Sequence, residues 1–153
     1  MKNIYLVERS ADSPRAEAVR NLTDAKVCTT DDITKLAQDG LSIDLVIECS
    51  GNPNAFMTGC EILRNRGIYL VPGQYSNSGN ISFPPQIITF KALQIIGSSQ
   101  YDASDVADYI QFLSDNRDMA DKLAALVKTF KLEDVNEAIA ATEQHIYNKV
   151  ALV

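Results

Sequence analysis

The chain alternates short apolar runs with stretches in which apolar side chains recur every three or four residues. Runs rich in Val, Ile, Leu and Tyr, bounded by polar or glycine-containing segments, are typical of β-strands. They predict strands at 3–8, 26–28, 43–49, 67–72, 93–98, 127–130 and 148–153, with 81–83 as a further candidate. The run 67–72 is almost entirely apolar, which indicates a strand covered on both faces.

The stretches between these runs have the one-sided apolar spacing of helices. Asn52 is placed to cap a helix on which Phe56, Cys60 and Leu63 share one face. Helices are predicted at 14–22, 30–38, 53–63, 84–90, 106–113, 119–125 and 135–142. Strands that alternate with helices indicate an α/β fold with a doubly wound, mostly parallel sheet and helices on both faces. We expect one domain over residues 1–153.

Composition narrows the class of protein. The 153 residues are 46% hydrophobic and 22% charged, as in ordinary globular domains. A net charge of −6 argues against a nucleic-acid partner, and no apolar run is long enough to span a bilayer. Cys28, Cys49 and Cys60 are odd in number and widely spaced, which favours reduced thiols in the cytoplasm. Cys49 ends a predicted strand, and we interpret it as a small core residue and not as a nucleophile, because no histidine is placed to activate it. His145 is the single histidine, and there is no CxxC or HxxxH pattern, so we expect no zinc site.

Several segments together resemble one known family. They are "VIECSGNP", "GIYLVPGQYSNSGNISF", "FKALQIIGS", "FKLEDVNEAI" and the final "NKVALV". Their order and spacing are similar to those in the second half of the medium-chain, zinc-type alcohol dehydrogenases. The resemblance implies that this chain is the Rossmann coenzyme-binding domain of such an enzyme. In that family, a separate preceding domain carries the zinc ligands and the catalytic groups.

The resemblance also implies that the domain is truncated at its N-terminus. "KNIYLVER" matches the family's second strand, so we expect the first strand and its glycine loop to be missing. None of the seven glycines is spaced to form GxGxxG, the turn that lets a helix N-terminus approach a pyrophosphate. With the catalytic domain and its zinc ligands also outside the chain, we expect any NAD binding to be weak or absent.

The resemblance assigns the remaining cofactor-facing positions to the ends of strands. Glu8 would hold the adenosine ribose hydroxyls, or it is simply a solvated acid at a strand end. Its neighbour Arg9 would favour a 2′-phosphate, but Glu8 would repel one, so NAD is the expected coenzyme. The nicotinamide side would be lined by Ser50, Gly51 and Asn52, by Gly73 and Gln74, and by Ser98. The alternative is an ordinary turn and helix cap for Ser50–Asn52, a turn glycine at Gly73, and a loop serine at Ser98.

Two structural hypotheses follow from the missing first strand. Its absence leaves a slot beside the strand 43–49, and we expect the C-terminal strand 148–153 to fill it, from the same chain or from a swapped partner. In the family, the strand that matches Leu93–Gly97 pairs with its twofold mate. We therefore expect a homodimer through Leu93–Gly97.

Three functions are compatible with the sequence. The first is a remnant of a dehydrogenase domain without catalysis of its own, kept as a dimeric interaction or scaffold module. The second is a weak NAD(H)-binding module that acts with a separate catalytic half. The third, ranked last, is an independent dehydrogenase. A neighbouring reading frame for the missing half would favour the second.

Overall fold

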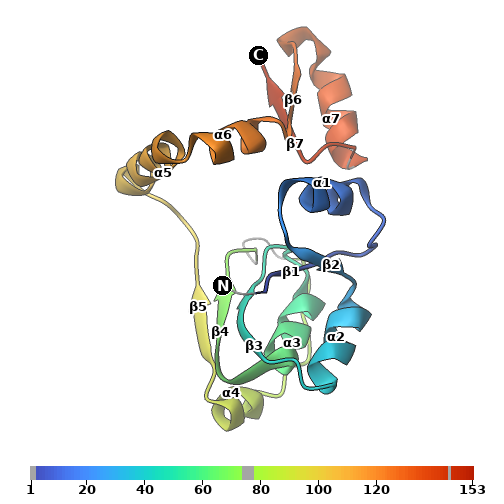
Figure 1. Ribbon diagram of the computed structural model, residues 1–153, viewed down its shortest axis with the longest axis vertical. Coiled ribbons are helices and arrows are strands. Elements are labelled where there is room, and N and C mark those ends of the chain that lie inside the picture. The colour runs from blue at the N-terminus through green and yellow to red at the C-terminus, as the bar shows by residue number, and fades with distance from the viewer. Residues whose placement is uncertain (1–2, 74–77, 145) are drawn as a thin grey trace. The chain divides into compact units, whose positions relative to one another are not determined.

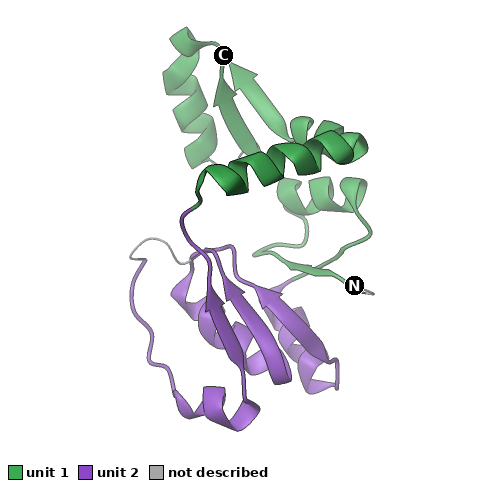
Figure 2. Ribbon diagram, turned by 90° about the vertical axis from the view of Figure 1, so that its left-hand side faces the viewer, with its two compact units in different colours: residues 1–28, 101–153 green, residues 29–100 purple. Residues whose placement is uncertain are grey.

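The computed structural model describes residues 3–73, 78–144 and 146–153. It divides into two compact units, residues 1–28 with 101–153 and residues 29–100 (Figure 2). All of its strand pairs are parallel, which confirms the predicted α/β class. The prediction that both units form one domain stays a prediction.

The unit 29–100 is built on a three-stranded parallel sheet in the order β3-β4-β5. Its elements are α2 (Thr30–Gln38), β3 (Ile43–Ile47), α3 (Pro53–Ile62), β4 (Leu63–Val71), α4 (Gln86–Lys91) and β5 (Gln94–Gly97) (Figure 1). Residues 81–83, a candidate strand, adopt irregular structure instead. Because the strands are parallel, all three end at the same edge of the sheet.

The core of this unit lies between α3, α4 and the sheet. Cys60, Leu63, Tyr69 and Leu93 form its buried cluster. Phe56 packs edge-on against the ring of Tyr69, with 5.2 Å between the ring centroids. The predicted apolar face of α3 is therefore the face that packs into the core. Burial of side chains of this size is the main stabilising contribution in such a layered fold.

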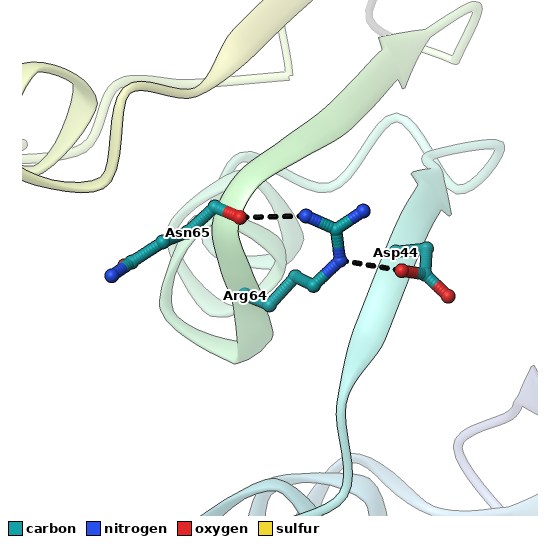
Figure 3. Close-up of polar contacts among 3 residues, drawn as sticks. All are labelled: Asp44, Arg64 and Asn65. Carbon is teal, nitrogen blue, oxygen red and sulfur yellow. Dashed lines mark hydrogen bonds and ion pairs between the residues drawn. The ribbon is translucent and has the colours of Figure 1, made fainter.

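Strand β4 begins earlier than its apolar run predicted, because three polar residues belong to its first half. Arg64 Nε donates to Asp44 Oδ1, and Arg64 Nη1 donates to the carbonyl oxygen of Asn65 at 2.7 Å (Figure 3). The register of β4 against β3 shifts in this stretch. Arg66 takes a left-handed conformation with φ of 61°. A polar, irregular start of this kind does not have the alternation by which strands are recognised in a sequence.

The other unit contains two separate pairs of parallel strands. Its first elements are β1 (Tyr5–Val7), α1 (Pro14–Leu22) and β2 (Lys26–Cys28). Its later elements are α5 (Ala103–Asp115), α6 (Arg117–Ala124), β6 (Val127–Phe130), the 3-10 turn η1 (Leu132–Asp134), α7 (Val135–Glu143) and β7 (Lys149–Leu152). In the described part of the chain, no helix is long and apolar enough to cross a membrane.

The C-terminal strand pairs with the strand that precedes it in the sequence. β7 pairs with β6 along its whole length, from Val127 opposite Lys149 to Phe130 opposite Leu152. This pairing is local: α7 connects the two strands as a short crossover, so β7 finds its partner close along the chain. The expectation that 148–153 fills a slot beside the strand 43–49, from the same chain or from a swapped partner, stays a prediction.

Helix α5 forms as the spacing predicted, but its apolar stripe is not buried by the described residues. Val106 is 44% exposed and Ile110 is 62% exposed. Neither α5 nor α6 has a buried residue. The hydrophobic spacing thus predicted the helix correctly, but it did not show which part of a protein packs against the apolar face of the helix.

Candidate functional site

Three predicted positions of the unit 29–100 lie together at the carboxyl edge of its sheet. Ser50–Asn52 follow β3, Gly73 follows β4, and Ser98 follows β5. In parallel α/β sheets this edge is the usual place for ligands, because loops from neighbouring strands converge there. Gln74, the fourth candidate in this unit, lies outside the described residues, and so does His145 in the other unit.

Backbone hydrogen bonds join the three strand ends. The N–H of Glu48 donates to the carbonyl of Leu70 at 2.9 Å, and the N–H of Gly73 donates to the carbonyl of Glu48 at 2.8 Å. Ser98 continues the pattern, since its N–H donates to the carbonyl of Val71 at 3.3 Å. The ladder therefore extends beyond the strands and holds their terminal turns in register.

Glu48 organises the first of these turns. Its side chain is 4% exposed, and its Oε1 accepts three hydrogen bonds. The donors are the N–H of Ser50 at 2.7 Å, the hydroxyl of Ser50 at 2.5 Å and the N–H of Gly51 at 3.0 Å. Ser50 Oγ in turn accepts from the N–H of Asn52 at 3.1 Å. A carboxylate that receives several donors in this way fixes the local backbone strongly.

The second carboxylate oxygen of Glu48 has no hydrogen-bond partner among the described residues and is buried. It lies against the Cα of Gly73, because a Cβ added there would come within 2.8 Å of Oε2 and of the Glu48 carbonyl oxygen, and within 2.7 Å of the Cys49 carbonyl carbon. Any side chain at position 73 would therefore displace Glu48 or the backbone of the strand end. An unpaired buried acceptor is costly, which makes this oxygen the unusual feature of the site.

The two glycine turns touch each other. Gly51 has a φ of 68°, and a Cβ there would lie 2.8 Å from the carbonyl oxygen of Gly73. Both the left-handed backbone and the close approach require glycine at position 51. Asn52 then caps α3, its Oδ1 accepting from the N–H of Asn54 at 2.9 Å. The turn thus does act as a helix cap, one of the two interpretations that its sequence allowed.

Cys49 lies between Glu48 and this turn, and it differs from its prediction. The sequence indicated a small buried residue, whereas Cys49 is exposed. Partial desolvation of its thiol, followed by repulsion from Glu48, raises the pKa of Cys49. The thiol is therefore held in its protonated form, which is a poor nucleophile. The interpretation that Cys49 is not a nucleophile agrees with this direction.

Glu8 and Arg9 belong to the other unit, where they follow β1. The N–H of Glu8 donates to the carbonyl of Cys28 at 3.0 Å, so Glu8 continues the β1–β2 ladder by one residue. Glu8 is half-buried and Arg9 is exposed. Their assignment to an adenosine ribose stays a prediction, as does the assignment of the other site residues to a cofactor.

Among residues 3–73, 78–144 and 146–153, no cluster of three or more His, Cys, Asp or Glu is arranged to hold a metal ion. We therefore assign no zinc ligands to the described residues.

Glu48 is the residue that the sequence interpretation missed. The signal was present, since an acid interrupts the apolar run "IDLVIEC" just before the glycine turn. Acidic residues are almost never fully buried unless they have partners. A carboxylate at the end of a buried strand, followed at once by Ser and Gly, was therefore a candidate for capping its own turn.

The chain is similar to known dehydrogenases in sequence. The family model described as a zinc-binding dehydrogenase matches residues 3–115. D-xylulose reductase of Saccharomyces cerevisiae is 28% identical over 125 residues, which are 82% of this chain and 34% of that enzyme. The chain thus spans about a third of the length of this curated relative.

Solved structures match nearly the whole chain. An alcohol dehydrogenase from E. coli CFT073 in complex with NADH has a TM-score of 0.79 at 22% identity, over 99% of this chain and 44% of that one. TarJ of S. aureus in complex with NADPH has a TM-score of 0.76 at 21% identity, over 98% of this chain and 46% of that one. At this level of identity the matches show the fold, and they confirm the predicted Rossmann-like architecture.

Proposed function

Because the chain belongs to the zinc-binding dehydrogenase family, we propose that it is a coenzyme-binding module of a dehydrogenase-like oxidoreductase and that it binds NAD(H). The observation that carries this proposal is the joined carboxyl edge of β3, β4 and β5. There a Cβ at Gly51 would meet the carbonyl oxygen of Gly73, and a Cβ at Gly73 would meet Glu48 and Cys49, so neither position has room for a side chain. Turns held backbone to backbone offer a preformed surface to a flat ligand ring.

Each candidate residue has a role in this proposal. Ser50, Gly51, Asn52, Gly73 and Ser98 would line the nicotinamide end of the coenzyme. Glu8 of the other unit would accept hydrogen bonds from the adenosine ribose, with the exposed Arg9 beside it. The bound coenzyme would supply the hydride acceptor or donor, and the chain would hold and orient it.

We further propose that the chain does not catalyse hydride transfer alone and acts with a separate catalytic half. The support is the partial overlap with relatives, since the chain spans 34% of D-xylulose reductase. The catalytic groups would come from further residues of the same polypeptide or from another chain. Mixing the chain with a recombinant catalytic half and following NADH absorbance tests this, and activity of the 153-residue chain alone would contradict it.

Coenzyme binding is tested by thermal-shift titration of the 153-residue chain with NAD, NADH and NADPH. A ligand that binds only the folded state stabilises it by RT ln(1 + [L]/Kd), about 2.7 kcal/mol at a hundredfold excess over Kd. We expect a saturable rise in melting temperature with NAD or NADH, and a smaller one with NADPH because Glu8 repels a 2′-phosphate. No rise with any of the three at millimolar concentration would contradict the proposal.

A matched pair of glycine variants ties the binding to the site. Gly73→Ala places a methyl group against Glu48 and Cys49, so it should abolish the ligand-dependent rise. Gly97→Ala adds the same group at the end of β5, where a Cβ meets nothing within 4 Å. This control should bind like the wild type. Equal binding by both variants would place the coenzyme elsewhere.

A second candidate function is a dimeric interaction module, and one observation favours it. β5 pairs only with β4 in the described sheet, and its Ile96 is 46% exposed. A free strand edge with an exposed apolar side chain is a template for pairing with a second copy. We propose a homodimer through Leu93–Gly97. Light scattering at micromolar concentration should give twice the chain mass, and Ile96→Lys should give the monomer mass; a monomeric wild type would contradict the dimer.

A further inference from the structure

We propose that the turn after β3 is a carboxylate-binding site that the chain fills with its own Glu48. In this interpretation Glu48 is a positioning residue that occupies the N–H groups of Ser50 and Gly51. Those groups are then not available to an anionic part of a ligand. The proposal goes beyond coenzyme binding, because it concerns what the turn recognises whether or not a nucleotide binds.

The first argument is the number and kind of donors that converge on a single atom. Glu48 Oε1 accepts from two backbone N–H groups and one hydroxyl, all at 2.5 to 3.0 Å. An acidic side chain without specific hydrogen-bond partners would turn toward solvent, where water hydrates its charge at no cost. Glu48 is instead 4% exposed. The turn therefore supplies much of the stabilisation that water would otherwise give to this carboxylate.

The second argument is that Glu48 is coupled to the head of α3. Ser50 Oγ donates to Glu48 and accepts from the N–H of Asn52, the residue that caps this helix. The first turn of α3 contains no acidic residue. The positive end of the helix thus has the Glu48 carboxylate nearby, four residues before its cap, and no competing acid within its first turn.

The third argument concerns Oε2, which is buried, has no partner among the described residues, and lies against Gly73. An anionic ligand group brought to this turn would meet a negative charge that is already in place. Its phosphate or carboxylate would have to displace Glu48 to reach the donors. The turn therefore selects for neutral ligand groups, and Glu48 is the residue that determines this selectivity.

Chemical rescue of Glu48→Ala tests the proposal. The substitution keeps Cβ and removes a fragment with the size and charge of acetate. We expect the variant to melt at a lower temperature than the wild type, and acetate to raise that temperature by several degrees in a saturable manner. Acetamide, which has a similar shape and no charge, should give a much smaller rise. Sodium chloride at equal ionic strength should raise the melting temperature of the variant no more than it raises that of the wild type.

The controls separate anion recognition from general effects. Glu61→Ala removes an exposed acid at the end of α3, and its melting temperature should not respond to acetate more than that of the wild type. Equal rescue of Glu48→Ala by acetate and acetamide would mean that a cavity is filled without recognition of charge, and it would overturn the proposal. No rescue by acetate would overturn it as well.

A second variant keeps the proposal testable if Glu48→Ala does not fold in any buffer. Glu48→Gln preserves the volume and removes the charge, so the hydrogen bond from the Gly51 N–H should weaken. Hydrogen exchange at Gly51 should then become faster than in the wild type, while exchange at Leu93, in the core, stays unchanged. Unchanged exchange at Gly51 would overturn the proposal. Neither the rescue by acetate nor the hydrogen exchange at Gly51 requires NAD. Failure of this proposal can therefore be distinguished from failure of coenzyme binding.

Discussion

The two units of the chain are stabilised by different kinds of side chain (Figure 2). In the unit 29–100 the largest fully buried side chains among the described residues, those of Tyr69, Leu63 and Cys60, pack together. In the other unit the buried hydrophobic residues are small: Ala16, Cys28, Ala138 and Ala141. Large apolar residues of that unit, among them Tyr109 at 55% exposure, remain in contact with solvent.

This difference connects packing with the candidate site. The turns at Gly51 and Gly73 end the strands that the aromatic core supports, and Tyr69 and Gly73 lie on the same stretch of chain. A site that depends on contacts of 2.7 to 3.0 Å needs such a rigid support. The helix α5, by comparison, has no buried residue to hold it in one place. We therefore expect substitutions in the unit 29–100 to have the larger effects.

The largest effect should come from the centre of the core. Tyr69→Ala removes a ring that is 0% exposed, and it should lower the free energy of unfolding by about 3–5 kcal/mol, as for other buried aromatic residues. Tyr109→Ala, on α5, is the matched control and should change it by less than about 0.5 kcal/mol. Urea denaturation followed by circular dichroism measures both. Equal losses would mean that α5 is covered in solution.

The next effect should come from the contact between the two turns. Gly73→Ala forces a methyl group into atoms 2.7 and 2.8 Å away, and it should cost about 1–3 kcal/mol of stability. Gly97→Ala meets open space and should be close to neutral. The urea midpoints of the two variants are the measurement. A stable Gly73→Ala variant would show that the strand ends can separate without loss.

Lys91 should have a smaller effect, because it stabilises the end of α3 from a neighbouring helix. Its Nζ donates to the carbonyl oxygens of Cys60 and Leu63 at 3.1 and 2.8 Å, and also to that of Glu61. Lys91→Met retains the aliphatic stem and should cost about 1–2 kcal/mol, since three carbonyls lose a charged donor. Lys122→Met on α6 is the control, and a similar loss there would contradict this explanation.

Arg66→Gly should stabilise the protein slightly. Arg66 has a φ of 61° at the irregular start of β4, a conformation that costs a residue with a side chain about 1 kcal/mol. Glycine adopts it freely, but the greater entropy of glycine in the unfolded chain offsets part of the gain. A net increase of about 0.5 kcal/mol in the free energy of unfolding is expected from urea titration. A decrease would mean that the Arg66 side chain makes a stabilising contact in solution.

The smallest effect on stability should come from the capping boxes at the starts of α2 and α5, one in each unit. The Thr29 backbone N–H and then its hydroxyl lower the pKa of Asp32, and the Ser104 hydroxyl and then its N–H lower the pKa of Asp102. Folded values below the ordinary 3.8 mean that this stability is present above that pH and is lost as the pH falls through the folded values. NMR titration of both carboxyl groups tests the direction. Folded pKa values at or above 3.8 would contradict it.

Most of the secondary structure was predictable because its signals are local. α1, β2, α2 and β6 have the bounds that the sequence indicated. Prolines, caps and the spacing of apolar residues act within one or two turns of chain, so they can be recognised without knowledge of the fold. The start of β4 was not predictable, because its polar residues are held by the neighbouring strand β3.

The site was predictable in position but not in chemistry. The resemblance to the dehydrogenase family indicated the strand ends at Ser50–Asn52, Gly73 and Ser98. They did not indicate that the Glu48 carboxylate turns back onto Ser50 and Gly51, or that Gly51 contacts Gly73. The same holds for the pairing of β7 with β6. These contacts form only when the chain has folded and the groups have packed together. The sequence alone does not show which of several possible partners each group will contact, because that choice is made by packing.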